Sequence, residues 1–140
     1  MKSLYLKLLY FGIMKKYVFI FTLLSLFGCI KTNSSYVAVL SPDAYEAKLS
    51  ARSLIIDVRT PEEFAAGHLE NAININFFDT DFEDQISDYK TNKKVFIYCK
   101  SGRRSGLAAT KMTGLGFGRV INLKGGILAW EQDGKPIITN

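Results

Sequence analysis

The chain reads V-F-I-Y-C-K-S-G-R-R-S from Val95 to Ser105, which predicts a strand, a tight turn and a helix in direct succession. Residues 95–98 are apolar and mostly β-branched or aromatic, as is typical of a short buried strand. Apolar residues then recur at helical spacing from Leu107 onward. Cys99 therefore stands where a buried strand ends and a turn leads into a helix.

Three cations crowd this turn: Lys100, Arg103 and Arg104. A helix N-terminus carries a partial positive charge, so a sequence selected for stability alone would place Asp or Glu there. The small residues Ser101 and Gly102 allow successive backbone N–H groups to point inward, which favours binding of an anion. A cysteine in such surroundings has a lowered thiol pKa, so we expect a reactive thiolate at Cys99.

Less reactive interpretations of these residues exist. A free cysteine at the end of a strand is often only a small buried hydrophobe. One of the two neighbouring arginines is expected to be an ordinary solvated charge. The number of cations near the thiol favours the reactive interpretation of Cys99.

The stretch C-K-S-G-R-R-S resembles the active loop of rhodanese-type sulfurtransferases, Cys-x-x-Gly-x-Arg-Ser/Thr. Cysteine phosphatases share the order strand, cysteine, loop and helix, but in them five residues separate the cysteine from an arginine. Here Arg104 follows Cys99 after four residues, Ser105 occupies the phosphatase arginine position, and Tyr98 replaces the usual histidine. The shorter loop forms a smaller cradle, which favours a terminal sulfur over a phosphate.

The resemblance implies a sulfurtransferase that moves sulfane sulfur from a donor such as thiosulfate, through a persulfide on Cys99, to cyanide or a thiol. The loop that holds the persulfide would consist of Lys100, Ser101, Gly102, Arg103, Arg104 and Ser105. We expect no cofactor, no metal and no nucleic-acid partner. We also expect the protein to be a monomer. The physiological donor and acceptor are not readable from the sequence. The alternative is a non-enzymatic rhodanese-like module that carries sulfur or binds a partner.

Two further stretches strengthen the resemblance. Residues 57–75 are similar to the rhodanese motif near the start of the domain, and residues 119–130 to the motif near its end. Together with the loop they cover nearly all of residues 36–140. Glu70-Asn71 departs from the family's usual Pro-Gly, and we expect Asn71 to adopt the left-handed conformation in place of glycine.

Other polar residues in these stretches are predicted to be structural. Asp57 and Arg59 are expected to pair with each other rather than to catalyse. His68 is the only histidine, but a thiolate with a lowered pKa needs no base, and the family places a structural residue there. Trp130 is expected in the core. Cys99 and His68 alone cannot form a zinc site.

The chain as a whole predicts an α/β fold with one rhodanese-like domain over residues 36–140. Strands are expected at 36–40, 54–58, 72–76, 95–99 and 120–123. Helices are expected from Pro42 to about Leu49, from Thr60 to Gly67, at 82–89, from the active loop to about Gly114, and finally around Trp130. This alternation predicts a parallel sheet of about five strands with helices on both faces. Ligands of such sheets bind at the carboxyl ends of the strands, where Cys99 falls.

The formal net charge of +5 comes mainly from the first 28 residues, which contain four lysines and no acid. The remaining residues contain 14 cations and 13 anions, so the charge of the domain does not suggest nucleic-acid binding. Met14-Lys15-Lys16 and the apolar run 17–28 predict a signal peptide over residues 1–28, in which Met14 is a possible start. The run is too short to cross a bilayer.

The stretch L-F-G-C at residues 26–29 resembles the bacterial lipoprotein box. It predicts lipidation of Cys29 and a short tether over residues 29–35. The domain would then be periplasmic and lipid-anchored to a membrane, the outer membrane being favoured over the inner because Ile30, not Asp, follows the cysteine. An ordinary signal peptide, or an uncleaved hydrophobic anchor, is the alternative.

Overall fold

The computed structural model describes residues 35–90 and 92–139. The predicted signal peptide, Cys29 and residues 30–34 of the predicted tether lie outside the described residues, so these parts of the interpretation stay predictions. Within the described ranges, no helix combines the length and the apolar character that a membrane crossing requires.

Five parallel strands form one sheet in the order β1-β5-β4-β2-β3. The strands are β1 (Tyr36–Leu40), β2 (Leu54–Asp57), β3 (Ala72–Asn74), β4 (Lys94–Tyr98) and β5 (Arg119–Leu123). Every neighbouring pair runs parallel. The carboxyl ends of all five strands therefore meet at one edge of the sheet, with β4 in the centre.

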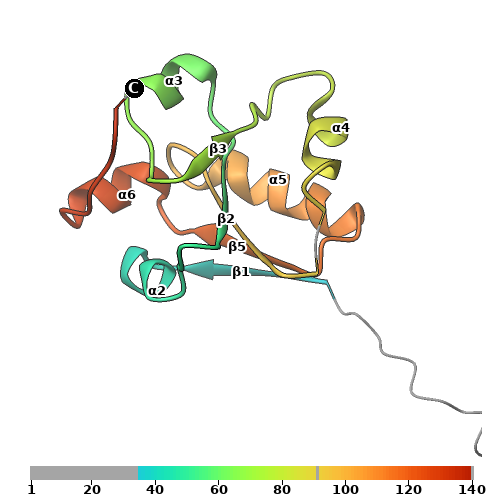
Figure 1. Cartoon of the computed structure of the whole chain (residues 1–140), viewed down its shortest axis with the longest axis horizontal. Coiled ribbons are helices and arrows are strands. Elements are labelled where there is room, and N and C mark those ends of the chain that lie inside the picture. Colours follow the sequence, from blue (N-terminus) through green and yellow to red (C-terminus); the bar gives the residue numbers. More distant parts are fainter. Residues whose placement is uncertain (1–34, 91, 140) are drawn as a thin grey trace, which may run out of the picture. The chain divides into compact units, whose positions relative to one another are not determined.

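Helices cover both faces of this sheet (Figure 1). They are α2 (Pro42–Glu46), α3 (Pro61–Ala65), α4 (Phe82–Ser87), α5 (Arg103–Gly114) and α6 (Gly126–Gln132). Residues of α4 and α5 pack with one face in a cluster that includes Ile97 and Met112. Residues of α2 and α6 pack with the other face in a cluster that includes Phe96 and Trp130. Successive side chains of β4 point to opposite faces of the sheet, so Phe96 and Ile97 belong to two separate hydrophobic cores.

The predicted elements and the predicted parallel sheet are confirmed, although the first three helices are shorter than expected. The helix after Pro42 ends at Glu46, because Lys48 and Leu49 donate their backbone N–H groups to the carbonyls three residues earlier, at 3.1 and 2.9 Å. Such tighter bonds commonly close a short helix. Asn71 has a φ of 61°, which confirms that asparagine takes the left-handed conformation here.

Asp57 and Arg59 form the predicted structural pair. Arg59 donates from Nη2 to Oδ2 of Asp57 at 2.5 Å and from Nε at 2.9 Å, and both side chains are buried. The same Nη2 donates to the carbonyl of Gly67 at 2.6 Å. This pair ties the end of β2 to the chain that leaves α3, at the edge of the sheet where the site lies.

Replacing Asp57 by alanine is expected to lower the free energy of unfolding by about 3–5 kcal/mol, because it leaves the Arg59 guanidinium buried without its counter-charge. Urea unfolding measures this loss. The matched control is Lys111→Ala, which breaks the exposed Lys111–Glu83 pair and should cost under about 1 kcal/mol. Similar losses for the two variants would show that the Asp57–Arg59 pair contributes no more than a surface pair.

Candidate functional site

Cys99 lies directly after β4, at the carboxyl edge of the sheet and at the foot of α5. It is the free cysteine of the described residues, and only 1% of its surface is exposed. Gly102 precedes α5 with a φ of 88°, a left-handed conformation that turns the chain back over the sulfur. The predicted order of strand, cysteine, turn and helix is therefore present, and the thiol is buried beneath the turn.

Hydrogen-bond donors converge on the Cys99 sulfur. The backbone N–H of Gly102 donates to Sγ at 3.2 Å, and the buried Ser105 hydroxyl donates to it at 3.4 Å. Burial alone would raise the pKa of the Cys99 thiol, but hydrogen bonds from the Ser105 hydroxyl and from the amides of residues 105, 101 and 102 outweigh it and lower that pKa. These donors stabilise a negative charge on sulfur.

Two consecutive glycines between β5 and α6 allow the start of α6 to contact this loop. After β5, Gly125 and Gly126 both adopt left-handed conformations, with φ values of 74° and 63°. The next two residues donate their backbone N–H groups into the loop, Ile127 to the carbonyl of Cys99 at 2.9 Å and Leu128 to that of Lys100 at 3.2 Å. The first turn of α6 therefore fixes the backbone on either side of the Cys99–Lys100 peptide.

Space is the reason that Gly126 is glycine. A Cβ at this position would lie 2.5 Å from the carbonyl carbon and oxygen of Lys100, and closer still to the carbonyl oxygen of Cys99. The doubled glycine was a signal of a close backbone approach, but the sequence alone does not say which backbone approaches.

Asn122 is a second support that sequence reasoning missed. Its buried side chain, at the end of β5, donates from Nδ2 to the carbonyl of Gly102 at 3.3 Å. The same carbonyl accepts the Gly106 N–H at 3.1 Å, so Asn122 ties the residue before α5 to the end of β5. Asparagine within an otherwise apolar strand was the available signal.

Arg104 lies close to the thiol but is engaged by a carboxylate. Its Nη1 and Nη2 donate to the two oxygens of Glu63 at 2.7 and 2.8 Å. The sequence predicted Arg104 as a residue of the binding loop, and the structure adds that it pairs with Glu63, a residue 41 positions earlier in the chain. The local absence of acids in the loop gave no sign of this distant partner.

Glu63 has a second role at the start of α3. It forms a capping box with Thr60, whose hydroxyl accepts from the Glu63 N–H at 3.3 Å while the Glu63 carboxylate accepts from the Thr60 N–H at 3.1 Å. The hydrogen bonds from Arg104 hold the pKa of the Glu63 carboxyl at about 2, so Glu63 stays ionised at any ordinary pH. Glu63, and also the Cys99 sulfur, raise the pKa of Arg104.

The other two cations of the loop are free to act on approaching molecules. Lys100 and Arg103 are exposed, as is Ser101. Neither cation forms an ion pair with a residue in the described part of the chain. They therefore leave uncompensated positive charge at the mouth of the site, whereas Arg104 and Glu63 largely cancel each other.

His68 and Trp130 have structural contacts, as expected. The His68 ring stacks on the Phe64 ring at 3.8 Å, and its Nδ1 lies 3.0 Å from the Phe64 carbonyl. Trp130 is buried and donates from Nε1 to the carbonyl of Pro136 at 2.9 Å. Over residues 35–90 and 92–139, no group of three or more His, Cys, Asp or Glu side chains is arranged to hold a metal ion.

Comparison with known proteins agrees with this geometry. The sequence profile of the rhodanese-like domain matches residues 41–133. A sulfurtransferase of Allochromatium vinosum is 39% identical over 85 residues, which cover 61% of this chain and 78% of that protein. Thiosulfate sulfurtransferase 16 of Arabidopsis thaliana, a chloroplast protein, is 36% identical over 91 residues, covering 58% of this chain and 76% of the relative.

A solved structure has the same fold. A rhodanese-related protein from Thermoplasma volcanium superposes with a TM-score of 0.66 at 26% identity. The match covers 74% of this chain and 99% of that one. Its extent leaves the fold of the domain in no doubt.

Gly126→Ala is expected to lower the free energy of unfolding by about 3 kcal/mol or more, because the new methyl group collides with the loop backbone. It should also slow alkylation of Cys99 by iodoacetamide at neutral pH, since the displaced loop no longer directs its amides at the sulfur. Urea unfolding and mass-resolved alkylation measure the two effects.

Gly134→Ala is the matched control for this variant. Gly134 also has a left-handed φ, of 70°, but a Cβ there meets nothing within 4 Å. Gly134→Ala should lower the free energy of unfolding only by the backbone strain of about 1 kcal/mol, and it should leave alkylation of Cys99 unchanged. Equal effects of the two substitutions on alkylation would refute the claim that contact with Gly126 shapes the loop.

Proposed function

The chain belongs to the rhodanese-like family, and from this we propose that it is a sulfurtransferase that carries sulfane sulfur on Cys99. The observation that supports the proposal most is the set of donors around the Cys99 sulfur, namely the Gly102 N–H at 3.2 Å and the Ser105 hydroxyl at 3.4 Å. They favour an anionic sulfur at this position, both as the attacking thiolate and as the persulfide that forms.

In the first step the Cys99 thiolate attacks the outer sulfur of a donor such as thiosulfate. A sulfur–sulfur bond forms between Sγ and that sulfur, while the donor's own sulfur–sulfur bond breaks and its electron pair leaves with sulfite. The charge is conserved, because a thiolate and a dianion become a persulfide anion and a dianion. Lys100 and Arg103 would attract the anionic donor to the opening.

In the second step a nucleophilic acceptor attacks the outer sulfur of the persulfide. The bond to Sγ breaks, and its electron pair restores the Cys99 thiolate. The outer sulfur stands about 2.05 Å beyond Sγ. An acceptor that attacks this outer sulfur does not have to reach Sγ itself, in a residue of which only 1% of the surface is exposed.

Phosphatase activity is the less favoured chemistry for this loop. In addition to the short spacing between Cys99 and Arg104, both terminal nitrogens of the Arg104 guanidinium are engaged by Glu63. A phosphate oxyanion would therefore meet an arginine whose charge a carboxylate already neutralises. A terminal sulfur needs only the backbone amides and the Ser105 hydroxyl.

A sulfur carrier without turnover is the second candidate function. A relative of 35% identity over 100 residues bears the name putative sulfur carrier protein, in Bacillus subtilis. The two functions differ in kinetics rather than in structure. Repeated release of sulfite in the presence of thiosulfate and cyanide indicates an enzyme, whereas one equivalent of sulfite indicates a carrier.

Treatment with thiosulfate is expected to add one sulfur atom to the wild-type protein at Cys99, which intact and peptide mass spectrometry detect. Cys99→Ser should gain none, because a hydroxyl at this position is not ionised. Cys29→Ser is the control for the other cysteine and should load like the wild type. A wild-type protein that stays unmodified with thiosulfate and other sulfane donors would disprove the proposal.

Arg104→Ala is expected to reduce kcat/KM for thiosulfate by about tenfold or more, because it leaves the Glu63 carboxylate unpaired near the thiolate and the donor. The double variant Arg104→Ala, Glu63→Gln should recover several-fold of this loss. Lys100→Ala should raise KM by only about two- to threefold, and the effect should vanish in high salt, which screens an exposed charge. Steady-state kinetics at two salt concentrations tests all three.

No recovery in the double variant would show that Arg104 acts through its own contacts rather than by neutralising Glu63. A Lys100→Ala effect that persists in high salt would show that Lys100 touches the donor instead of attracting it.

A further inference from the structure

Two exposed apolar side chains border the Cys99 loop. Phe78 is 65% exposed and Leu128 is 43% exposed. The ring of Phe78 lies 5.5 Å from the Arg104 guanidinium, and the Leu128 N–H bonds to the Lys100 carbonyl. Phe78 follows β3, and Leu128 lies in α6 after β5, so the two residues come from segments that follow strands on either side of β4.

Phe78 is held in its exposed position by a hydrogen-bonded turn. Its N–H donates to Oδ1 of Asn76 at 3.2 Å, and the same amide group donates from Nδ2 to Oδ1 of Asp79 at 2.7 Å. The Asp79 N–H closes the turn by donating to the Asn76 carbonyl at 3.1 Å. Single exposed apolar residues are common, but a fixed aromatic ring beside a reactive thiol provides a preformed contact for a partner.

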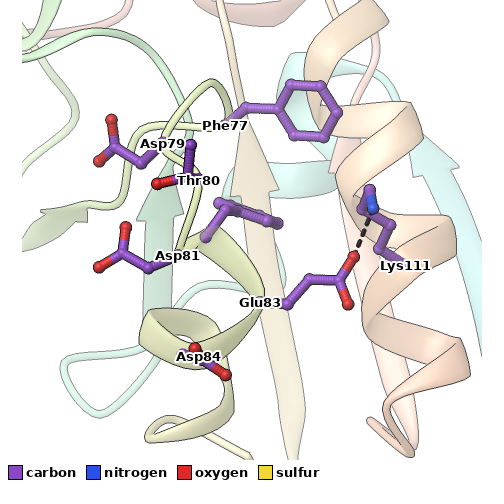
Figure 2. Close-up of a pocket in the computed structure, with 8 residues that line it drawn as sticks. Phe77, Asp79, Thr80, Asp81, Glu83, Asp84 and Lys111 are labelled. Carbon is purple, nitrogen blue, oxygen red and sulfur yellow. Dashed lines mark hydrogen bonds and ion pairs between the residues drawn. The ribbon is translucent and has the colours of Figure 1, made fainter.

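Several acidic residues follow Phe78 in the chain. Four of them, Asp79, Asp81, Glu83 and Asp84, line a surface cavity of about 200 Å³. Figure 2 shows that Glu83 turns toward Lys111 on α5, whereas the carboxylates of Asp79 and Asp81 point away from that lysine.

The charges of three of these acids are not compensated. Asp79 and Asp81 accept hydrogen bonds from the neutral side-chain amide of Gln85, at 3.4 and 2.8 Å. Neither they nor Asp84 form an ion pair with any residue that the structure describes. Phe78 thus contacts Arg104 of the positive loop, and these uncompensated acids follow Phe78 directly in the chain.

We propose that Phe78, Leu128 and the acids at positions 79, 81 and 84 form a docking surface for a polypeptide acceptor whose thiol lies beside basic and apolar residues. The inference rests on the proposed sulfur transfer and names the acceptor of its second step. A small anionic donor uses only the positive loop and is repelled by the acids. The acids and the apolar side chains therefore serve the other substrate, with basic residues facing the acids and apolar ones facing Phe78 and Leu128.

The transfer to such an acceptor balances without a further reactant. The acceptor thiolate attacks the outer sulfur of the Cys99 persulfide, and a sulfur–sulfur bond forms on the acceptor. The bond to Sγ breaks with its electron pair on Cys99. The products are an acceptor persulfide and the Cys99 thiolate, ready for another donor.

Two synthetic peptides with one central cysteine test the charge complementarity. One has lysine and leucine around the cysteine, and the other has glutamate in place of lysine. After thiosulfate has loaded full-length protein, the rate constants for loss of the persulfide to each peptide are measured at low salt. We expect the lysine peptide to react about tenfold faster than the glutamate peptide. Comparable rates in the wild type would overturn the inference.

Charge-reversal variants test where this preference arises. Asp84→Lys should reduce the ratio of the two rate constants to about threefold or less. Glu70→Lys is the matched control, because Glu70 is an exposed acid before β3, at the opposite edge of the sheet, and it should leave the ratio unchanged. Both rate constants are measured on the same variant, so a general change in the reactivity of its persulfide affects both equally and leaves their ratio unchanged. Equal changes in both variants would contradict docking at residues 79–84.

The apolar contact is tested with Phe78→Ser. The ratio of the lysine-peptide rate to the cyanide rate should fall about fivefold, because cyanide is too small to reach the ring. Val39→Ser, which removes an apolar side chain that is 58% exposed on β1, should leave this ratio unchanged. An unchanged ratio in Phe78→Ser would overturn the role of Phe78. Failure of thiosulfate to load Cys99 at all would instead disprove the proposed function.

Discussion

The hydrogen bonds to the sulfur of Cys99 are the interaction on which the rest of the site depends. A thiol that is 99% buried would ordinarily resist ionisation, because an apolar environment disfavours the charged form. Here the Gly102 N–H and the Ser105 hydroxyl point at the sulfur and reverse this preference. The loop conformation that aims them is therefore the structural requirement for an anionic sulfur.

That conformation is imposed from three directions of the fold. β4 ends at the centre of the carboxyl edge, so Cys99 lies there, and α5 begins four residues later, beside the sulfur. Asn122 at the end of β5 bonds to the Gly102 carbonyl, and the first turn of α6 bonds to the carbonyls of Cys99 and Lys100, an approach that Gly126 permits. From α3, which follows β2, Glu63 holds Arg104, so this cation of the loop is itself fixed and largely neutralised. The remaining positive charge at the mouth belongs to Lys100 and Arg103.

Sequence reasoning reached the fold and the candidate loop because both depend on local patterns. Strand and helix alternation predicted the parallel sheet, and the residues from Cys99 to Ser105 predicted the turn at its edge. Glu63 and Asn122 were missed because their partners lie 41 and 20 positions away in the chain. Gly126 was visible as a glycine, but its need for space became clear only with the Lys100 carbonyl beside it. Local sequence patterns do not reveal which distant residues meet.

The most direct test is an ultraviolet titration of the Cys99 thiolate, taken as the difference between the wild type and Cys99→Ser. Titrating the folded protein and the urea-unfolded chain under matched ionic strength compares the same sulfur with and without its donors. The loop geometry predicts a lower midpoint pH in the folded protein. A folded midpoint equal to or above the unfolded one would show that burial prevails over the hydrogen bonds, and would contradict an anionic sulfur at this site.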